Sequence, residues 1–340
     1  MTAAVMSFRD ARAGAKRSGP EDAASQAPPG LDVPAQSRVS EIQRQRILAA
    51  MADVTAERGA AAVTVAHIVA RSGVSRRTFY ELFSDREECL LAALDQAIRR
   101  AKDAVLPAYE APGRWRERIR AGLAAMLQFL DEEPAMARLC VVESLGAGPR
   151  ALERHTQIVQ ALIAAVDKGR TEARPGKRPP PLTAEGTVGA ALAVIHARLL
   201  VPNRKPLSPL TPALMGLIVH PYLGQPAAER ELSKPAPQIQ TNKRSRTTDP
   251  FDGLDMRLTY RTVRVLIAIA ANPRASNRGV ATAAGIADQG QISKLLTRLQ
   301  NLGLICNQGE GAPKGAPNAW ALTAKGQEVE RSIRIESSGG

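Results

Sequence analysis

The sequence predicts a mainly α-helical protein that ends in a small domain with a β-hairpin. Apolar residues recur at the helical spacing through the first 225 residues, and no alternating strand pattern appears there. After residue 254, three helical segments precede two short apolar runs that a Gly/Pro-rich loop joins. The length of 340 residues accommodates two or three domains, and the aromatic content of 3% requires cores built from Ala, Val, Leu and Ile.

Residues 1–39 are rich in Ala, Gly, Ser and Pro and poor in large apolar side chains. Such a segment buries too little surface to offset the entropy of ordering, so we predict a disordered arm. Contact with phosphates is one interpretation of its basic residues and an inert tail is another. These residues are Arg9, Arg12, Lys16 and Arg17.

Residues 40–101 contain four predicted helices. The first spans Ser40–Arg58 and ends at Gly59. Thr64 is a good N-cap for a second helix over Val65–Arg71, and Gly73 provides the turn that follows. The other two helices are expected over 74–83 and 86–101.

A short helix, a glycine turn and a second helix are the elements of a helix-turn-helix, whose second helix enters the major groove of DNA. Six apolar residues would hold the two helices together: Val65, Ile68, Val74, Phe79, Leu82 and Phe83. Five residues would then point outward: Ser75, Arg76, Arg77, Thr78 and Tyr80. The alternative interpretation is a solvated, charged helix face.

The run Val-Ser-Arg-Arg-Thr-Phe-Tyr-Glu-Leu-Phe at 74–83, followed by Ser-Asp-Arg-Glu-Glu, strongly resembles the tetracycline-repressor (TetR) family of regulators. The resemblance implies contacts to the DNA phosphates from Thr64, Thr78, Tyr80 and Arg86. It also implies that Arg76 and Arg77 face base edges. There an arginine pairs with guanine through two hydrogen bonds and discriminates by about 1–3 kcal/mol.

Residues 102–224 are predicted to form further helices over 115–131, 135–144, 149–168, 183–200 and 210–223. The TetR resemblance implies that this all-helical domain binds a small-molecule effector and forms a homodimer. The last two helices carry few charges, which is compatible with a four-helix interface. His155, His196 and His220 are candidate ligand contacts, although a structural histidine is the commoner case.

Residues 225–253 are expected to form an extended, mobile linker, because they contain four prolines and a basic cluster at 243–246. Beyond it, at 254–340, helices are expected over 259–271, 277–284, 288–302 and 324–335, and short strands over 304–306 and 319–322. Three helices followed by a hairpin are the order of a winged-helix domain.

The stretch 277–305, together with Trp-Ala-Leu-Thr-Ala-Lys-Gly at 320–326, resembles winged-helix repressors of the MarR type. The resemblance implies that the third helix of this domain reads the major groove and that the hairpin touches the DNA backbone. The candidate DNA contacts are Arg278, Gln289, Gln291, Ser293, Lys294, Arg298 and Lys314. A protein-interaction module is the alternative interpretation of this domain.

The formal net charge of +13 points toward a polyanionic partner. The helix-turn-helix segment contributes little to it, because residues 40–100 hold nine basic and eight acidic side chains. No catalytic or metal-binding constellation appears, so the sequence predicts neither an enzyme nor a cofactor. The three cysteines lie far apart, and no signal peptide or membrane-spanning segment is visible, which favours the cytoplasm.

The sequence therefore predicts a cytoplasmic, ligand-responsive transcriptional repressor that binds double-stranded DNA as a homodimer. Its partners would be DNA, a small-molecule effector and a second copy of the chain, and no membrane. A helical enzyme or ligand-storage protein with a relict helix-turn-helix is the rival interpretation.

Overall fold

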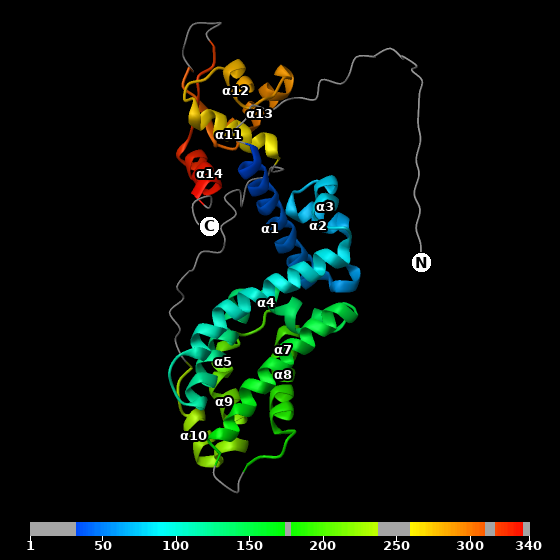
Figure 1. Cartoon of the computed structure of the whole chain (residues 1–340), viewed down its shortest axis with the longest axis vertical. Coiled ribbons are helices and arrows are strands. Elements are labelled where there is room, and N and C mark those ends of the chain that lie inside the picture. The colour runs from blue at the N-terminus through cyan, green and yellow to red at the C-terminus, as the bar shows by residue number, and fades with distance from the viewer. Residues whose placement is uncertain (1–31, 174–177, 237–258, 310–316, 336–340) are drawn as a thin grey trace, which may run out of the picture.

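The structure of the chain is a computed structural model, which describes residues 32–173, 178–236, 259–309 and 317–335. The described residues form three groups along the long axis of the molecule (Figure 1). We call them the head, the helical domain and the C-terminal domain. Helices dominate all three groups, and the C-terminal domain holds a two-stranded sheet.

The head comprises α1 (Asp32–Arg58), the 3₁₀ turn η1 (Ala60–Ala62), α2 (Val65–Ser72), α3 (Arg76–Leu82) and the first part of α4 (Arg86–Glu110). Its core contains Ile47, Leu48 and Met51 of α1, all buried, with Ile68 of α2 and Phe79 of α3. Helix α4 runs on into the helical domain and ends nine residues beyond the expected Ala101. Consequently, one continuous helix joins the head to the helical domain.

Helix α1 begins at Asp32, so the expectation of a disordered arm over residues 1–39 is corrected for 32–39, while residues 1–31 lie outside the described residues. The physical reason is a partner in the C-terminal domain. Val39 is 3% exposed and belongs to the core of that domain, against which Ile42 also packs. Burial of these two side chains stabilises the first turns of the helix.

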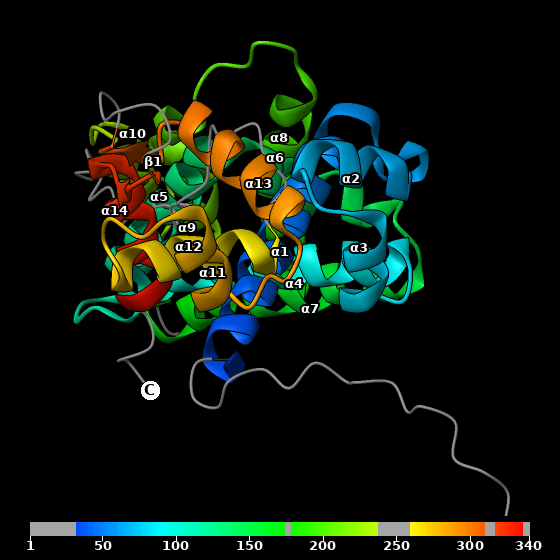
Figure 2. The ribbon, with the colours of Figure 1, turned by 90° about the horizontal axis from the view of Figure 1, so that it is seen from above.

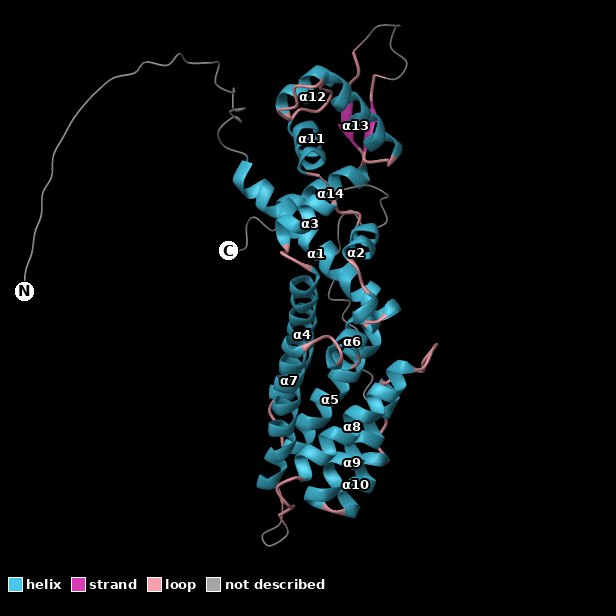
Figure 3. Ribbon diagram, turned by 90° about the vertical axis from the view of Figure 1, so that its right-hand side faces the viewer, coloured by secondary structure: helices cyan, strands magenta, loops and turns pink. Residues whose placement is uncertain are grey.

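The helical domain extends from α4 to α10. Its elements are α5 (Trp115–Glu132), α6 (Pro134–Val141), η2 (Glu143–Leu145), α7 (Pro149–Asp167), η3 (Lys168–Thr171), α8 (Thr183–Leu200), η4 (Ser208–Leu210), α9 (Thr211–Leu223) and α10 (Gln225–Leu232). Figure 3 shows these helices at the end of the molecule opposite the C-terminal domain. Their core is apolar and includes Leu127, Ile195, Met215 and Val219.

Helix α10 occupies residues that we expected in the linker, so the linker does not begin at residue 225. Pro226 stands in the first turn, where a proline lacks no hydrogen bond that the helix needs. Ala227, Ala228 and Glu231 are buried, and Leu232 packs so closely on α9 that a Cβ at Gly216 would lie 3.0 Å from it. The apolar face of α10 thereby completes the core.

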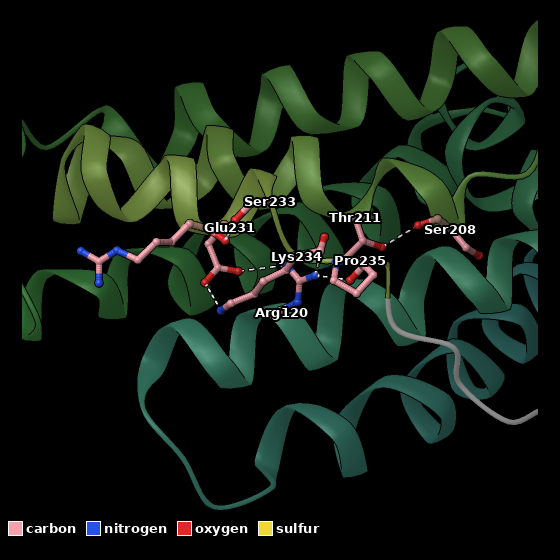
Figure 4. Close-up of polar contacts among 8 residues, drawn as sticks. Arg120, Ser208, Thr211, Glu231, Ser233, Lys234 and Pro235 are labelled. Atoms are coloured by element: carbon pink, nitrogen blue, oxygen red, sulfur yellow. Dashed lines mark hydrogen bonds and ion pairs between the residues drawn. The ribbon is translucent and has the colours of Figure 1, made fainter.

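A buried ion pair fixes α10 to α5 (Figure 4). The carboxylate of Glu231, only 2% exposed, receives Arg120 Nη1 at 2.9 Å and Lys234 Nζ at 2.5 Å. The Arg120 guanidinium also donates to the Pro235 carbonyl at 2.7 Å. This arrangement satisfies a carboxylate that could not otherwise be buried.

The C-terminal domain comprises α11 (Tyr260–Ala271), α12 (Asn277–Ala283), α13 (Gln289–Asn301), β1 (Ile305–Asn307), β2 (Trp320–Leu322) and α14 (Ala324–Ile335). The two strands are antiparallel, with Ile305 opposite Leu322. The Trp320 indole donates to Asn277 Oδ1 at 2.6 Å, which ties the hairpin to the start of α12. The order of helices and strands matches the expectation.

Among the described residues, no helix combines the length and the apolar character that crossing a bilayer requires. The head and the C-terminal domain lie toward one end of the molecule, and α8–α10 lie at the other (Figures 1 and 3). Figure 2, which looks down on the first of these ends, shows α2 and α3 to one side of α11, α12 and α13.

Candidate nucleic-acid interface

The local geometry of the head follows from three capping positions. Thr64 caps α2, and its hydroxyl accepts from the His67 backbone N–H at 3.3 Å. Gly73 ends α2 with φ 66° and ψ 12°, a left-handed conformation that glycine adopts without steric cost. Ser75 then caps α3 and accepts from the Thr78 N–H at 3.0 Å. These caps fix where α3 starts relative to α2.

The inner face of α3 packs as expected. Phe79 is fully buried in the core of the head, and the centroid of its ring lies 5.8 Å from the ring centroid of Phe83. Ile68 and Val74 are buried beside it, and Val65 and Leu82 are partly buried against the same core. The apolar side chains that we selected from the sequence therefore hold the two helices together.

The outer face of α3 is open to solvent. The Arg77 side chain is 89% exposed and Tyr80 is 54% exposed, and Arg76 and Thr64 are also exposed. Ser75 and Thr78 are half-buried and share a hydrogen bond of 2.8 Å between their hydroxyls. The structure thus places five of the expected head residues on α3 and its cap, whereas Thr64 caps α2 and Arg86 begins α4.

Arg77 has an internal partner that the sequence analysis did not consider. Its Nε donates to Glu81 Oε1 at 2.8 Å, four residues along the helix. An exposed pair of this kind contributes about 0–1 kcal/mol, so a phosphate or a guanine can displace the carboxylate at little cost. The pair also places a negative charge on the outer face of α3.

Arg86 lies at the first position of α4, and its Nη1 donates to the Ala60 carbonyl at 2.6 Å. This contact gives the side chain a role inside the head, where it holds the connection between α1 and α2. The phosphate contact that the resemblance implies for Arg86 stays a prediction.

The C-terminal candidates lie mostly on the outer face of α13, where Gln289, Gln291, Ser293, Lys294 and Arg298 are all exposed, and Arg278 is exposed on α12. Lys314 lies outside the described residues.

Three side chains missed in the sequence analysis shape the surface of α13. Arg261 of α11 donates to Gln291 Oε1 at 2.7 Å, and Asn277 of α12 donates to Ser293 Oγ at 3.4 Å. Asp288 caps α13, and hydrogen bonds from the backbone N–H groups of Gln291 and Gly290 hold the pKa of its carboxyl below the ordinary value. Asp288 thus keeps a negative charge at the start of this helix.

The three candidate histidines of the helical domain occupy different environments. His155 Nδ1 lies 3.1 Å from Ser144 Oγ and 3.4 Å from the Cys140 carbonyl, so these groups can satisfy that nitrogen within the protein. His196 is half-buried on α8, and His220 is exposed on α9. In the contacts described for these residues, the three imidazoles share no common partner and form no single site.

The head has the geometry of a helix-turn-helix, and comparison with known proteins shows which regulators its sequence is similar to. Residues 47–93 match the sequence profile of the bacterial regulatory proteins of the tetR family. This similarity lies within the head and extends from α1 into α4. The winged-helix assignment of the C-terminal domain stays a prediction.

Two curated relatives come from Mycolicibacterium smegmatis. The chain is 32% identical over 106 residues to the HTH-type transcriptional regulator EthR, covering 31% of this chain and 48% of EthR. It is 27% identical over 131 residues to the HTH-type transcriptional activator FasR, covering 38% of this chain and 54% of FasR. The chain therefore spans about half the length of the curated relatives it matches.

Solved structures of regulators also align with the chain. The fatty acid degradation regulator FadR from Bacillus halodurans aligns with a TM-score of 0.47 and 17% identity, over 52% of this chain and 94% of FadR. RolR in complex with resorcinol aligns with a TM-score of 0.40 and 20% identity, over 60% of this chain and 99% of RolR.

Proposed function

We propose that the chain is a transcriptional regulator that binds double-stranded DNA by inserting α3 into the major groove. The observation that carries this proposal is the geometry of α3, with Phe79 fully buried on one side and Arg76, Arg77 and Tyr80 exposed on the other. A helix anchored in this way presents its cationic and hydrogen-bonding groups to a groove without disturbing the core. The tetR-family match of residues 47–93 supports the same function.

The test begins with in vitro selection of DNA duplexes from a random pool by the full chain. Binding of the selected duplex is then measured by fluorescence anisotropy across a range of salt concentrations. Arg76→Ala and Arg77→Ala should each weaken binding and relax the sequence preference at the base pair that the arginine faces. Arg230→Ala is the matched control, since this exposed arginine lies on α10 at the other end of the molecule. The proposal would be refuted if no DNA sequence were enriched. It would also be refuted if a variant with both Arg76→Ala and Arg77→Ala bound the selected duplex as tightly as the wild type.

The proposal includes homodimerisation through the low-charge helices α8 and α9. Val194, Leu200 and Leu217 are 38%, 48% and 40% exposed, although each is a large apolar side chain. A second copy of the same face would cover them, and a twofold axis would then present two heads to two half-sites. Sedimentation equilibrium should give twice the monomer mass, and a monomer at micromolar concentration would contradict this part.

The proposal also includes a small-molecule effector bound inside the helical domain, with release of DNA as the response. Tyr222 is 3% exposed, and its hydroxyl has no hydrogen-bond partner among the described residues. Its ring lies 5.1 Å from that of Trp115, so an apolar ligand with one polar atom would find both kinds of contact there. A ligand that binds more tightly when the spacing of the two heads differs from that of the half-sites would lower the DNA affinity. Tyr222→Phe should weaken the response to any effector found by screening. Without effector, the DNA affinity of this variant should equal that of the wild type.

For the C-terminal domain, we propose a second DNA-reading module of the winged-helix kind. The exposed polar face of α13 supports this proposal, since Gln, Ser, Lys and Arg all pair with base edges or phosphates. Truncation after residue 240 should then reduce both the DNA affinity and the salt slope. Equal affinity and equal slope would instead favour a protein-interaction module.

A further inference from the structure

A carboxylate of the helical domain contacts the connection between α1 and α2, beside the apolar contacts that Leu139 and Ala151 make with the core of the head. Glu143 of η2 accepts a hydrogen bond from the backbone N–H of Ala60 at 2.8 Å, across 83 positions of the chain. Ala60 opens η1, the connection between α1 and α2. Gly59 precedes it with φ 79°, and a Cβ built at Gly59 would lie 3.6 Å from the same carboxylate oxygen. The backbone therefore passes close to the Glu143 side chain.

Ala60 is held from two sides. Its carbonyl accepts from Arg86 Nη1 at 2.6 Å, and its N–H donates to Glu143. Arg86 stands on α4, within the head, whereas Glu143 belongs to the helical domain. The backbone N–H of Ala60 thus links the α1–α2 connection to the helical domain, and its carbonyl links the connection to α4. Charged groups form the stronger class of hydrogen bond, and both partners here are charged.

The surroundings of Glu143 fix it in place. Its side chain is 13% exposed, and its second carboxylate oxygen lies 3.7 Å from Arg138 Nη2. The next residue, Ser144, is fully buried and donates to the Cys140 carbonyl of α6 at 2.6 Å. The same hydroxyl contacts His155 of α7. A displacement of α6 or α7 would therefore move η2, and with it the carboxylate.

We propose that Glu143 is a positioning residue for DNA recognition, which holds the α1–α2 connection in the orientation that two half-sites require. This inference rests on the proposed function as a dimeric DNA-binding protein. Helix α2 begins at Val65, shortly after η1, so a shift of the connection would change the direction of the helix-turn-helix. The apparent dissociation constant rises as the fraction of molecules with both heads correctly oriented falls.

The experiment compares Glu143→Ala with Glu143→Gln, which keeps an acceptor oxygen but loses the charge. Glu153→Ala is the control, since Glu153 is an exposed glutamate on α7. Each full-length variant is measured against the selected duplex with two half-sites and against a duplex with one. Hydrogen exchange of the segment 59–72 is followed in the same proteins without DNA.

We expect Glu143→Ala to weaken binding to two half-sites about 10-fold, which corresponds to an oriented fraction of about one tenth. Binding to one half-site should change less than about twofold, because the reading face of α3 is intact. Hydrogen exchange of residues 59–72 should become faster in Glu143→Ala. In Glu143→Gln, the affinity for two half-sites and the exchange rate should both return most of the way to the wild-type values. Unchanged exchange in Glu143→Ala would overturn the inference, and so would a Gln variant as weak as the Ala variant.

The exchange measurement separates this inference from the proposed function. If the wild-type chain selects no duplex, the proposed function fails, and the positioning role for DNA recognition is overturned with it, whatever the exchange shows. If the wild type binds DNA and Glu143→Ala binds two half-sites equally well, only the positioning role fails.

Ala60→Pro provides a second variant on the donor side, should the glutamate variants fail to fold. Proline fits the first position of a helical turn, and it removes the N–H that donates to Glu143 while its Cδ displaces the carboxylate oxygen that accepted there. It should weaken two-half-site binding as Glu143→Ala does, and the double variant should be no weaker than either single variant. Additive losses would show that the two residues act independently and would overturn the inference.

Discussion

Removing either partner of the buried ion pair between α5 and α10 should destabilise the helical domain strongly. Glu231 is 2% exposed and Arg120 is 13% exposed, so each would be left as a charge with little access to water. Breaking a buried pair from one side costs about 3–5 kcal/mol. We expect the lower end of this range, about 3 kcal/mol, for both single variants. Arg120 keeps the Pro235 carbonyl in Glu231→Leu, and Glu231 keeps Lys234 in Arg120→Met.

The double variant separates the ion pair from the packing around it. Replacing both partners by apolar side chains of similar volume leaves no buried charge unpaired. The hydrogen bonds of Arg120 to the Pro235 carbonyl and of Lys234 to Glu231 are lost, so we expect a loss of about 2 kcal/mol. Independent single losses would add to about 6 kcal/mol, and the difference gives a coupling free energy of about 4 kcal/mol. Lys234→Met is the control, because the lysine side chain is 45% exposed and its pair should contribute less than about 1 kcal/mol.

Urea unfolding of the full chain, followed by circular dichroism, gives the free energy of unfolding of each variant. The unfolding slope should stay constant across the set, so that the midpoints can be compared directly. A loss below about 1 kcal/mol for Glu231→Leu, or additive losses in the double variant, would refute the argument from burial.

Three further predictions follow from other parts of the structure. Burial alone would raise the pKa of Asp131, but hydrogen bonds from side chains and backbone hold it below the ordinary value. Asp131→Asn should therefore cost about 2 kcal/mol at pH 7 in urea unfolding. The difference should begin to shrink only as the pH falls below about 4, the ordinary pKa of an aspartate, and should vanish below the lowered pKa of the folded state, where the wild-type carboxylate also loses its charge. Gly326→Ala should unfold the C-terminal domain, because its Cβ would lie 1.9 Å from a backbone carbonyl, whereas Gly279→Ala, in ordinary contact at 3.5 Å, should change the melting temperature little. Burial raises the pKa of Cys89 and of Cys140 to about 12, so neither thiol should react with a disulfide reagent at pH 8 unless the chain is unfolded first.

The sequence was informative wherever the signal is local. Thr64, Gly73 and Ser75 stand within a dozen residues of one another, and each acts through a hydrogen bond or a φ angle of its own segment. Buried Phe79 follows from the same spacing. The order of helices and strands in the C-terminal domain was predictable for the same reason, since turns and caps separate the elements.

Contacts between distant segments left no such signal. The carboxylate of Glu143 and the N–H of Ala60 meet across 83 positions, and nothing around either residue indicates the other. The start of α1 was missed because Val39 owes its burial to a domain that begins more than 200 residues later. Helix α10 was missed because the four prolines of residues 225–253 suggested an extended linker, whereas Pro226 lies in the first turn of a helix with a buried apolar face.

Helix α1 packs into two cores. The number of residues between its two contacts therefore fixes the orientation of the C-terminal domain relative to the head. Ile42 packs against the C-terminal domain and Ile47 belongs to the core of the head, five positions later. Each residue of an α-helix advances about 1.5 Å and turns about 100°. One residue inserted between these two positions would swing the C-terminal domain about 100° around the head, whereas four would restore nearly the same facing about 6 Å farther away. The helical phase of α1 thereby sets the angle between α3 and α13. Under the proposed function, an insertion in this one helix would change the relative orientation of the two DNA-reading modules.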